Sequence, residues 1–233
     1  MHVPETISKW ESRSPHGTWA TGCMAAAACC AGEFVRRNGR PCCWMVRMTS
    51  PMTLTVDPTS TAPALTLRPW QDSDIPTIVA AHCDEAMRSW LMRPIDDEDA
   101  ARAWLTYLDT HWADGTLLSW AVEEEGTVVG HFVIKAANPP VTLATGVGYW
   151  TVVEARGRGI ASRCVDAATE WLFGGQDFMP ADEIELLHTV GNEGSCRVAQ
   201  KCGYVLDSVL PPMPPKFPEE GHRHLRKRSS SAG

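Results

Sequence analysis

The sequence predicts a mixed α/β (α+β) domain in which helices flank a partly parallel central sheet. Apolar residues make up 44% of the 233 residues and charged residues 21%, as in ordinary globular proteins. Short segments that alternate apolar and polar residues recur along the chain and are typical of half-buried strands. Late in the chain these segments alternate with helical patterns, which favours a sheet with some parallel pairing.

The folded part begins with one strand and two helices. Residues 64–68 (ALTLR) alternate with period two and predict a half-buried strand. A helix with Ile75 and Ile78 on its inner face follows. A second helix begins near Asp97, whose carboxylate suits the positive helix N-terminus, and ends at Gly115.

The rest of the domain is expected to continue the sheet. The pair Glu125-Gly126 between two alternating segments predicts a hairpin. In chain order we expect strands over 117–124, 127–135 and 145–153, a helix over 159–173, a strand over 183–190, a helix over 195–202 and a strand over 204–210.

Residues 1–60 are predicted to be a disordered N-terminal extension. Five of the nine cysteines lie within the first fifty residues, without a CxxC pair or a His spacing that would complete a zinc site. We expect this segment to arise from an upstream-extended gene start, with Met48 or Met52 as the alternative first residue. The other cysteines are expected to be buried or half-buried thiols of a reducing compartment: Cys83, Cys164, Cys196 and Cys202.

The folded domain is expected to cover 61–212, and 213–233 to form an irregular Pro-rich and then basic tail. Leu225 is the only large apolar residue within 221–233, so no buried strand is expected there. A basic tail that binds nucleic acid and a truncated final strand are the two alternatives. The net charge of −7 argues against nucleic-acid binding by the chain as a whole, and no apolar run is long enough to cross a membrane.

The stretch from Gly148 to Leu172 carries the chemistry. A predicted strand runs into the loop RGRG, which opens directly into a helix. Backbone N–H groups at a helix N-terminus bind phosphate oxygens, and Arg156 and Arg158 add positive charge. The third glycine of a dinucleotide fingerprint is replaced by Ser162, and the chain contains neither a P-loop nor a GxSxG motif. The loop therefore predicts a diphosphate site of another kind.

The chain here resembles the GNAT superfamily of acyl-CoA-dependent N-acetyltransferases. RGRGIA, residues 156–161, fits the Arg/Gln-x-x-Gly-x-Gly/Ala signature of that superfamily. NEGSCRVAQKCGY, residues 192–204, is similar to the branch that contains the ribosomal-protein alanine acetyltransferases. The resemblance covers about Ala64 to Leu210.

The resemblance implies that acetyl-CoA lies where the strands expected over 145–153 and 183–190 splay apart. The pantetheine arm would pair with the first of these strands, and N–H groups near Trp150 would polarise the thioester carbonyl. The residues that it assigns to acetyl-CoA are Thr151, Val152, Val153, Arg156, Gly157, Arg158, Gly159, Ile160, Ala161, Ser162 and Asn192.

The resemblance also bears on the two proton transfers. Many superfamily members place a Tyr acid where this chain has Ala199, so Ser195 is expected to protonate the leaving thiolate. The alternative is that Ser195 only caps its helix. Asp207 is the expected base, with the acids at 123–125, His131 or a water relay as alternatives.

These observations predict a cytoplasmic enzyme that transfers the acetyl group of acetyl-CoA directly to a primary amine, either a protein N-terminus or a small amine. The resemblance makes Trp90 and Trp104 candidates for the acceptor pocket, because the first helices flank that pocket in the family. His222 and His224 resemble a metal dyad, but no Cys or carboxylate is spaced to complete it, so no metal is expected. We expect a monomer or homodimer that binds neither membrane nor nucleic acid. The alternatives are a non-catalytic CoA-binding or sensing module of the same fold and, more distantly, an NAD-binding oxidoreductase.

Overall fold

The computed structural model describes residues 51–91, 94–137, 144–174, 179, 181–215 and 217–229. Its strands are β1 (Leu54–Val56), β2 (Leu65–Arg68), β3 (Leu117–Glu124), β4 (Thr127–Lys135), β5 (Thr145–Thr151), β6 (Glu183–Thr189), β7 (Val205–Leu210) and β8 (Gly221–Lys227). Its helices are α1 (Ile75–His82), α2 (Glu85–Arg88), α3 (Glu98–Ala113), α4 (Ile160–Phe173) and α5 (Glu193–Lys201). Single 3₁₀ turns cover Asp72–Asp74 and Val153–Ala155.

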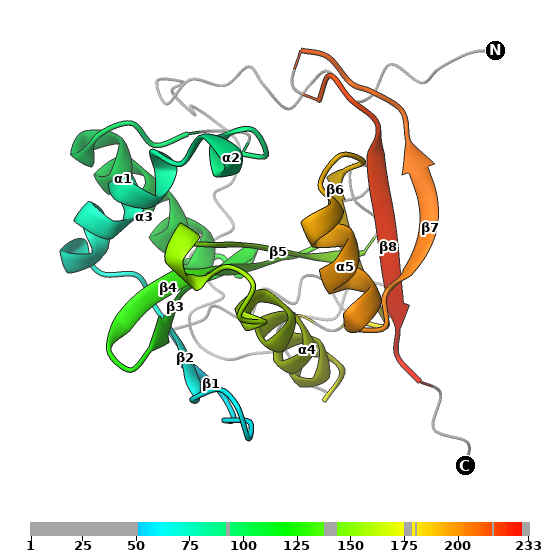
Figure 1. The fold of residues 1–233 in the computed structure, drawn as a ribbon, viewed down its shortest axis with the longest axis horizontal. Helices are drawn as coiled ribbons and strands as arrows, with labels where there is room; N and C mark the ends of the chain where they lie inside the picture. The colour runs from blue at the N-terminus through cyan, green and yellow to red at the C-terminus, as the bar shows by residue number, and fades with distance from the viewer. Residues whose placement is uncertain are drawn as a thin grey trace, which may run out of the picture. The chain divides into compact units, whose positions relative to one another are not determined.

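The eight strands form one mixed sheet in the order β1-β2-β3-β4-β5-β6-β8-β7. All neighbouring strands are antiparallel except β5 and β6, which are parallel. Figure 1 shows β5 crossing the centre of the domain, with β6, β8 and β7 following on one side and α5 lying beside β6. The predicted fold class is confirmed.

The β3–β4 hairpin forms the middle of the sheet. Its turn has positive φ at both central residues, 51° at Glu125 and 81° at Gly126, as a type I′ turn requires. On β3, Leu118 and Trp120 are fully buried in the core cluster that also contains residues of α4. Leu117, one residue out of phase, packs on the cluster built from α1 and α3. Helices therefore cover both faces of the sheet.

Helix termini follow the expected local chemistry. The Asp97 side chain caps α3 by accepting a hydrogen bond from the Ala100 N–H at 2.8 Å. The Asp84 side chain caps α2, a helix that the sequence analysis did not predict. Helix α4 begins after Gly159, which has a φ of 78°.

The N-terminal boundary differs from the expectation. Residues 1–50, with Met48 and the five N-terminal cysteines, lie outside the described residues. Residues 54–56 were expected to be disordered but form β1, which pairs with β2. The Met52 carbonyl accepts a hydrogen bond from Trp120 Nε1 at 2.9 Å, and Val56 is buried. Two apolar residues with period-two spacing are enough to add this short edge strand.

The C-terminal segment also corrects the sequence analysis. Residues 221–227 form β8, which lies between β6 and β7 and pairs with both. The expectation of an irregular tail was wrong because it required apolar side chains. This strand instead buries Leu225 and His224, and its charged side chains form ion pairs. Arg223 Nε lies 2.9 Å from a carboxylate oxygen of Glu185, whose side chain is 3% exposed.

The four cysteines in the described residues are free thiols. Cys164 and Cys202 are buried and Cys196 is intermediate, as expected, whereas Cys83 is exposed. Burial raises the pKa of Cys164 to about 12, so this thiol stays protonated at neutral pH. Among the helices that the structure describes, none is both long and apolar enough to cross a membrane.

We expect Arg223→Met to lower the free energy of unfolding by about 3–5 kcal/mol, because it leaves the Glu185 carboxylate buried without its partner. The double variant Arg223→Met/Glu185→Leu should recover most of that loss. Urea denaturation of the full chain measures both values.

The matched control is Lys227→Met on the same strand. Its ion pair with Glu183 joins side chains that are 69% and 41% exposed, so solvent screens it strongly. The midpoint of this variant should stay close to that of the unaltered protein. Equal losses for Arg223→Met and Lys227→Met would contradict the assignment of β8 as a strand held by a buried ion pair.

Candidate active site

The central feature of the site is the separation of β5 from β6. The two strands pair only from Thr145–Ile184 to Val147–Leu186, although both continue beyond this point. A cavity of about 760 Å³ occupies the opening. Its walls come from β5, β6, the loop before α4, α5 and α2. The predicted splay between these strands is present.

The backbone of β5 leaves hydrogen-bonding groups free toward this cavity. The Val152 N–H donates to the Val129 carbonyl of β4 at 3.1 Å. Because backbone groups alternate in direction along a strand, the N–H of Thr151 points the opposite way, toward the side that β6 has left. An extended ligand could therefore pair with β5 as an added strand.

The loop before α4 presents backbone N–H groups to the same cavity. Gly157 and Gly159 have φ values of 74° and 78°, in the left-handed region that glycine enters without steric cost. The first helical bond of α4 runs from the Arg163 N–H to the Gly159 carbonyl. The N–H groups of the preceding helical residues have no partner within the helix, so this end of α4 can accept an anion.

Carboxylates hold both arginines of this loop. Arg156 forms an ion pair with Asp84, the N-cap of α2, and lowers the pKa of that carboxyl. Arg158 forms an ion pair with Glu124, whose side chain is only 7% exposed. The cavity receives a further cation from α5, because Lys201 lines it and its Nζ lies 3.8 Å from the position of a Cβ on Gly159.

Helix α5 forms another wall of the cavity. Asn192 is its N-cap, and the Asn192 side chain accepts a hydrogen bond from the Ser195 N–H at 3.0 Å. The capping group is therefore Asn192, and the Ser195 hydroxyl is left for other contacts. Burial raises the pKa of Tyr149 on β5 to about 12, and an interaction with the Ser195 side chain acts in the opposite direction. Tyr149 and Ser195 both line the cavity.

The structure brings together most of the predicted residues. Those that line the cavity are Thr151, Arg156, Gly157, Gly159, Ile160, Ala161, Ser162, Asn192 and Ser195. Val152, Val153 and Arg158 are not part of its lining, and Val153 lies in the 3₁₀ turn after β5.

Asp207 lies apart from this group, on β7 at the far end of the sheet order. One of its oxygens accepts a hydrogen bond from Arg223 Nη1 at 3.0 Å, and the residue does not line the cavity.

The other candidate bases also have structural partners. Glu123 accepts a hydrogen bond from Arg68 Nε at 2.7 Å. His131 is buried, its Nδ1 accepts a hydrogen bond from Trp70 Nε1 at 3.2 Å, and burial lowers its pKa to about 3. Glu125 occupies the exposed hairpin turn.

An aromatic cluster packs against the β5 wall of the cavity. Trp150, which lines the cavity, stacks on His131 with ring centroids 5.6 Å apart. Trp70 contacts both rings and the edge of Trp104. His82 of α1 meets Trp150 edge-on. Of the two tryptophans expected near the acceptor, Trp90 lines the cavity and Trp104 belongs to this cluster.

A scan against protein families decides the identity of the fold. The model described as "Acetyltransferase (GNAT) domain" matches residues 64–205, more than half of the chain. The chain belongs to the GNAT acetyltransferase family. It is an acetyl-CoA-dependent acetyltransferase, as its sequence predicts. A comparison with curated proteins finds no match.

Solved structures with the same fold agree with this GNAT assignment. RimJ of Mycobacterium smegmatis in complex with CoA-disulfide superposes with a TM-score of 0.65 at 17% identity, covering 77% of this chain and 90% of that one. RimL, a ribosomal L7/L12 α-N-protein acetyltransferase, gives 0.62 at 17%, with 75% and 98% covered. The ribosomal-protein-S5-alanine acetyltransferase of Vibrio fischeri gives 0.59 at 18%, with 72% and 96% covered.

The GNAT cavity contains groups that the sequence analysis did not assign. Tyr149 precedes Trp150 in the expected strand over 145–153, but only the fold shows that its side chain comes close to Ser195 of α5. Ser195, Val198 and Lys201 all line the cavity and are three residues apart. This spacing is a one-face helical pattern, which was a signal available for Lys201.

We expect acid to destabilise the aromatic cluster through His82. Burial lowers the pKa of His82 from 6.5 to about 4. The unfolded chain therefore binds the extra proton below pH 6.5, and the stability contributed by the neutral ring is complete above that pH and is lost as the pH falls toward 4. Between pH 7 and pH 5 the loss should be about 1–2 kcal/mol.

The variant His82→Asn tests this dependence, because its amide oxygen can replace Nδ1 as the acceptor of the Ile95 N–H, which donates at 3.0 Å. Urea denaturation at several pH values should give the variant a shallower decline. Parallel profiles for the two proteins would assign the acid sensitivity to other groups.

Proposed function

We propose that this acetyltransferase transfers the acetyl group to a primary amine, with a protein N-terminal α-amine as the first acceptor class and small amines as the second. The observation that carries the proposal is the single cavity that joins the glycine loop before α4, the free edge of β5 and the Ser195 face of α5. Neighbours described as α-N-protein and ribosomal-protein-alanine acetyltransferases support this acceptor class. The free thiols of the described residues agree with a cytoplasmic location.

In this proposal the backbone N–H groups at the start of α4 hold the diphosphate of acetyl-CoA. Arg156 can turn from Asp84 to the phosphate, and Lys201 supplies a second cation near Gly159. The pantetheine arm pairs with the free edge of β5 at Thr151. The thioester then lies between β5 and α5, where backbone N–H groups can stabilise the oxyanion of the tetrahedral intermediate.

The amine attacks the thioester carbonyl directly, and two proton transfers complete the reaction. The attacking nitrogen must be neutral, and a free amine has a pKa near ~10 by analogy with Lys, so its proton must be taken by a base or a water. The leaving thiolate gains a proton from Ser195, whose hydroxyl is not used as the helix cap. Asp207 accepts a hydrogen bond from Arg223, and His131 accepts one from Trp70. A water relay is therefore the simplest route for the amine proton.

The proposal is tested by incubating the full chain with acetyl-CoA and peptides that have a free N-terminus, and by following thiol release and peptide mass. The control peptides have the same sequence with a blocked N-terminus and one internal Lys. Acetylation of the free peptide alone is the expected result. Acetyl-CoA binding without transfer to any amine would instead favour a CoA-sensing module.

We expect acetyl-CoA to raise the melting temperature and Gly159→Asp to remove most of that effect, because a carboxylate would occupy the anion site. Saturation at 100 times the dissociation constant should stabilise the fold by about 2.7 kcal/mol. The matched control is Gly126→Asp, which has a φ of 81° with nothing within 4 Å of an added Cβ. It carries a similar backbone cost far from the cavity and should keep the full ligand effect. An unchanged ligand effect in Gly159→Asp, or a rise with NAD in place of acetyl-CoA, would oppose this assignment.

Ser195→Ala should lower turnover in the peptide assay by about 10²-fold or more and leave the melting temperature nearly unchanged. Asn192→Ala, which removes the cap, should instead cost about 1 kcal/mol of stability. Melting and turnover measured on both variants separate the two roles. Normal turnover in Ser195→Ala would show that solvent, and not Ser195, protonates the leaving thiolate.

A further inference from the structure

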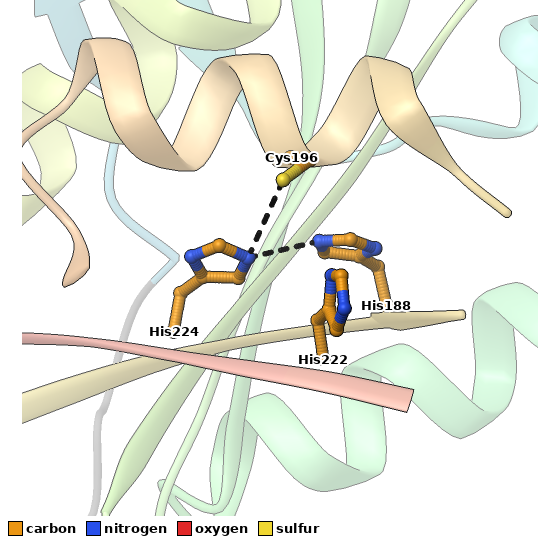
Figure 2. Close-up of side chains that lie close together, drawn as sticks. All are labelled: His188, Cys196, His222 and His224. Atoms are coloured by element: carbon orange, nitrogen blue, oxygen red, sulfur yellow. Dashed lines mark hydrogen bonds between the residues drawn. The ribbon is translucent and has the colours of Figure 1, made fainter. Parts of the chain in front are cut away.

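Three histidines and one cysteine gather beside the cavity. They come from three elements: His188 on β6, Cys196 on α5, and His222 and His224 on β8. One ligand atom from each of the four lies within 4.8 Å of all the others. Figure 2 shows the three imidazoles on the strands below and the thiol reaching down from the helix above.

The sheet register explains why the histidines meet. His188 is directly opposite His222 in the antiparallel β6–β8 pair. His224 is two residues further along β8 and therefore lies on the same face of the sheet. Helix α5 covers that face and brings Cys196 over the ring of His224 (Figure 2). The sequence analysis predicted no metal site at His222 and His224 because no further ligand is near them in the chain. The fold supplies two further ligands, His188 and Cys196.

The distances match the edges of a tetrahedral zinc site. His188 Nε2 and His224 Nε2 are 3.1 Å apart, and Cys196 Sγ is 3.8 Å from His224 Nε2. Zinc binds imidazole nitrogen at about 2.0–2.1 Å and thiolate at about 2.3 Å, so a regular tetrahedron has N–N edges of about 3.3 Å and N–S edges of about 3.6 Å. The remaining pairs of ligand atoms lie within 4.8 Å, so an ion at the centre would draw these side chains inward by up to about 1 Å.

Hydrogen bonding within the cluster does not satisfy its polar atoms. His224 Nε2 faces both His188 and Cys196, yet a neutral ring nitrogen has either one proton or one lone pair to offer. The buried Nδ1 of His222 has no hydrogen-bond partner among the described residues. His224 itself is 1% exposed, so water has little access to its ring.

The orientation of His188 favours metal binding. Its Nδ1 lies 2.8 Å from the carbonyl oxygen of Thr189. A carbonyl can only accept, so Nδ1 carries the proton and the lone pair of Nε2 points into the cluster. A backbone carbonyl that fixes the tautomer of a histidine in this way is the usual outer partner of a metal ligand.

We propose that His188, Cys196, His222 and His224 bind one Zn²⁺ ion as a structural site. Four protein ligands fill the tetrahedron and leave no position for a reacting water, which distinguishes the site from a catalytic zinc centre. Three imidazoles and a soft thiolate suit Zn²⁺ better than Mg²⁺ or Ca²⁺. Binding replaces the thiol proton of Cys196, which is released to solvent. The ion ties α5, with Ser195 and its cap, to β6 and β8.

The test uses the full chain without an affinity tag, dialysed after zinc loading and assayed for metal by mass spectrometry in the absence of acetyl-CoA. One zinc per chain is expected. Cobalt loading should give tetrahedral absorption bands together with a thiolate-to-cobalt charge-transfer band. Chelation should lower the melting temperature.

Variants assign the ligands. Cys196→Ser should abolish the charge-transfer band and weaken zinc binding by more than about 100-fold, since even loss of an outer partner costs 10–100-fold. Cys83→Ser and His111→Asn, which alter residues outside the cluster, should retain zinc, as should Ser195→Ala. If Cys196→Ser does not fold, the full chain with Ser at all five N-terminal cysteines and Cys83→Ser decides, because a charge-transfer band can then come only from Cys196 or from the buried Cys164 and Cys202.

Zinc well below one equivalent in the loaded protein would overturn the proposal, as would a cobalt spectrum without a thiolate band. A stoichiometric metal other than zinc would overturn the assignment of the ion. Because none of these measurements requires acetyl transfer, their outcome is independent of the acceptor.

Discussion

The parting of β5 from β6 is the constraint on which the rest of the site depends. Had the parallel pairing continued beyond Val147 and Leu186, the backbone groups of both strands would satisfy each other and no extended ligand could pair with β5. Because it stops there, the free edge of β5, the start of α4 and the face of α5 all border one cavity. The glycine loop matters only because this opening places a ligand over it.

The last strand keeps β6 in place once β6 has left β5. β6 pairs with β8 over its whole length from Glu183 to Thr189, but with β5 over only three residues. β6, which forms one wall of the cavity, is therefore held in the sheet chiefly by β8. The composition of β8 looked the least suited to a sheet. The Arg223–Glu185 ion pair stabilises the β6–β8 pairing, and the histidine cluster joins the same two strands. A charged terminal strand is thus a structural element of the active site.

Local sequence was sufficient for most of the fold. Period-two alternation located the central strands, Glu125-Gly126 predicted the hairpin turn, and the glycines at 157 and 159 predicted the turn that opens α4. β8 was missed because its stabilisation comes from partners on other strands, and alternation of apolar residues cannot report an ion pair between Arg223 and Glu185. The same limit hid the link between Cys196 and His224, which are 28 residues apart and meet only through the sheet register.

One carboxylate links the donor side of the cavity to its opposite wall. Asp84 accepts hydrogen bonds from the N–H groups of Ala86 and Met87 and also holds Arg156. A diphosphate at the start of α4 competes for the same guanidinium, because phosphate and carboxylate offer it the same bidentate geometry. If Arg156 turned to the phosphate as proposed, Asp84 would keep the helix cap but lose its charge partner. In that mode of binding, the position of α2, which brings Trp90 to the cavity, would be coupled to the binding of the acetyl donor.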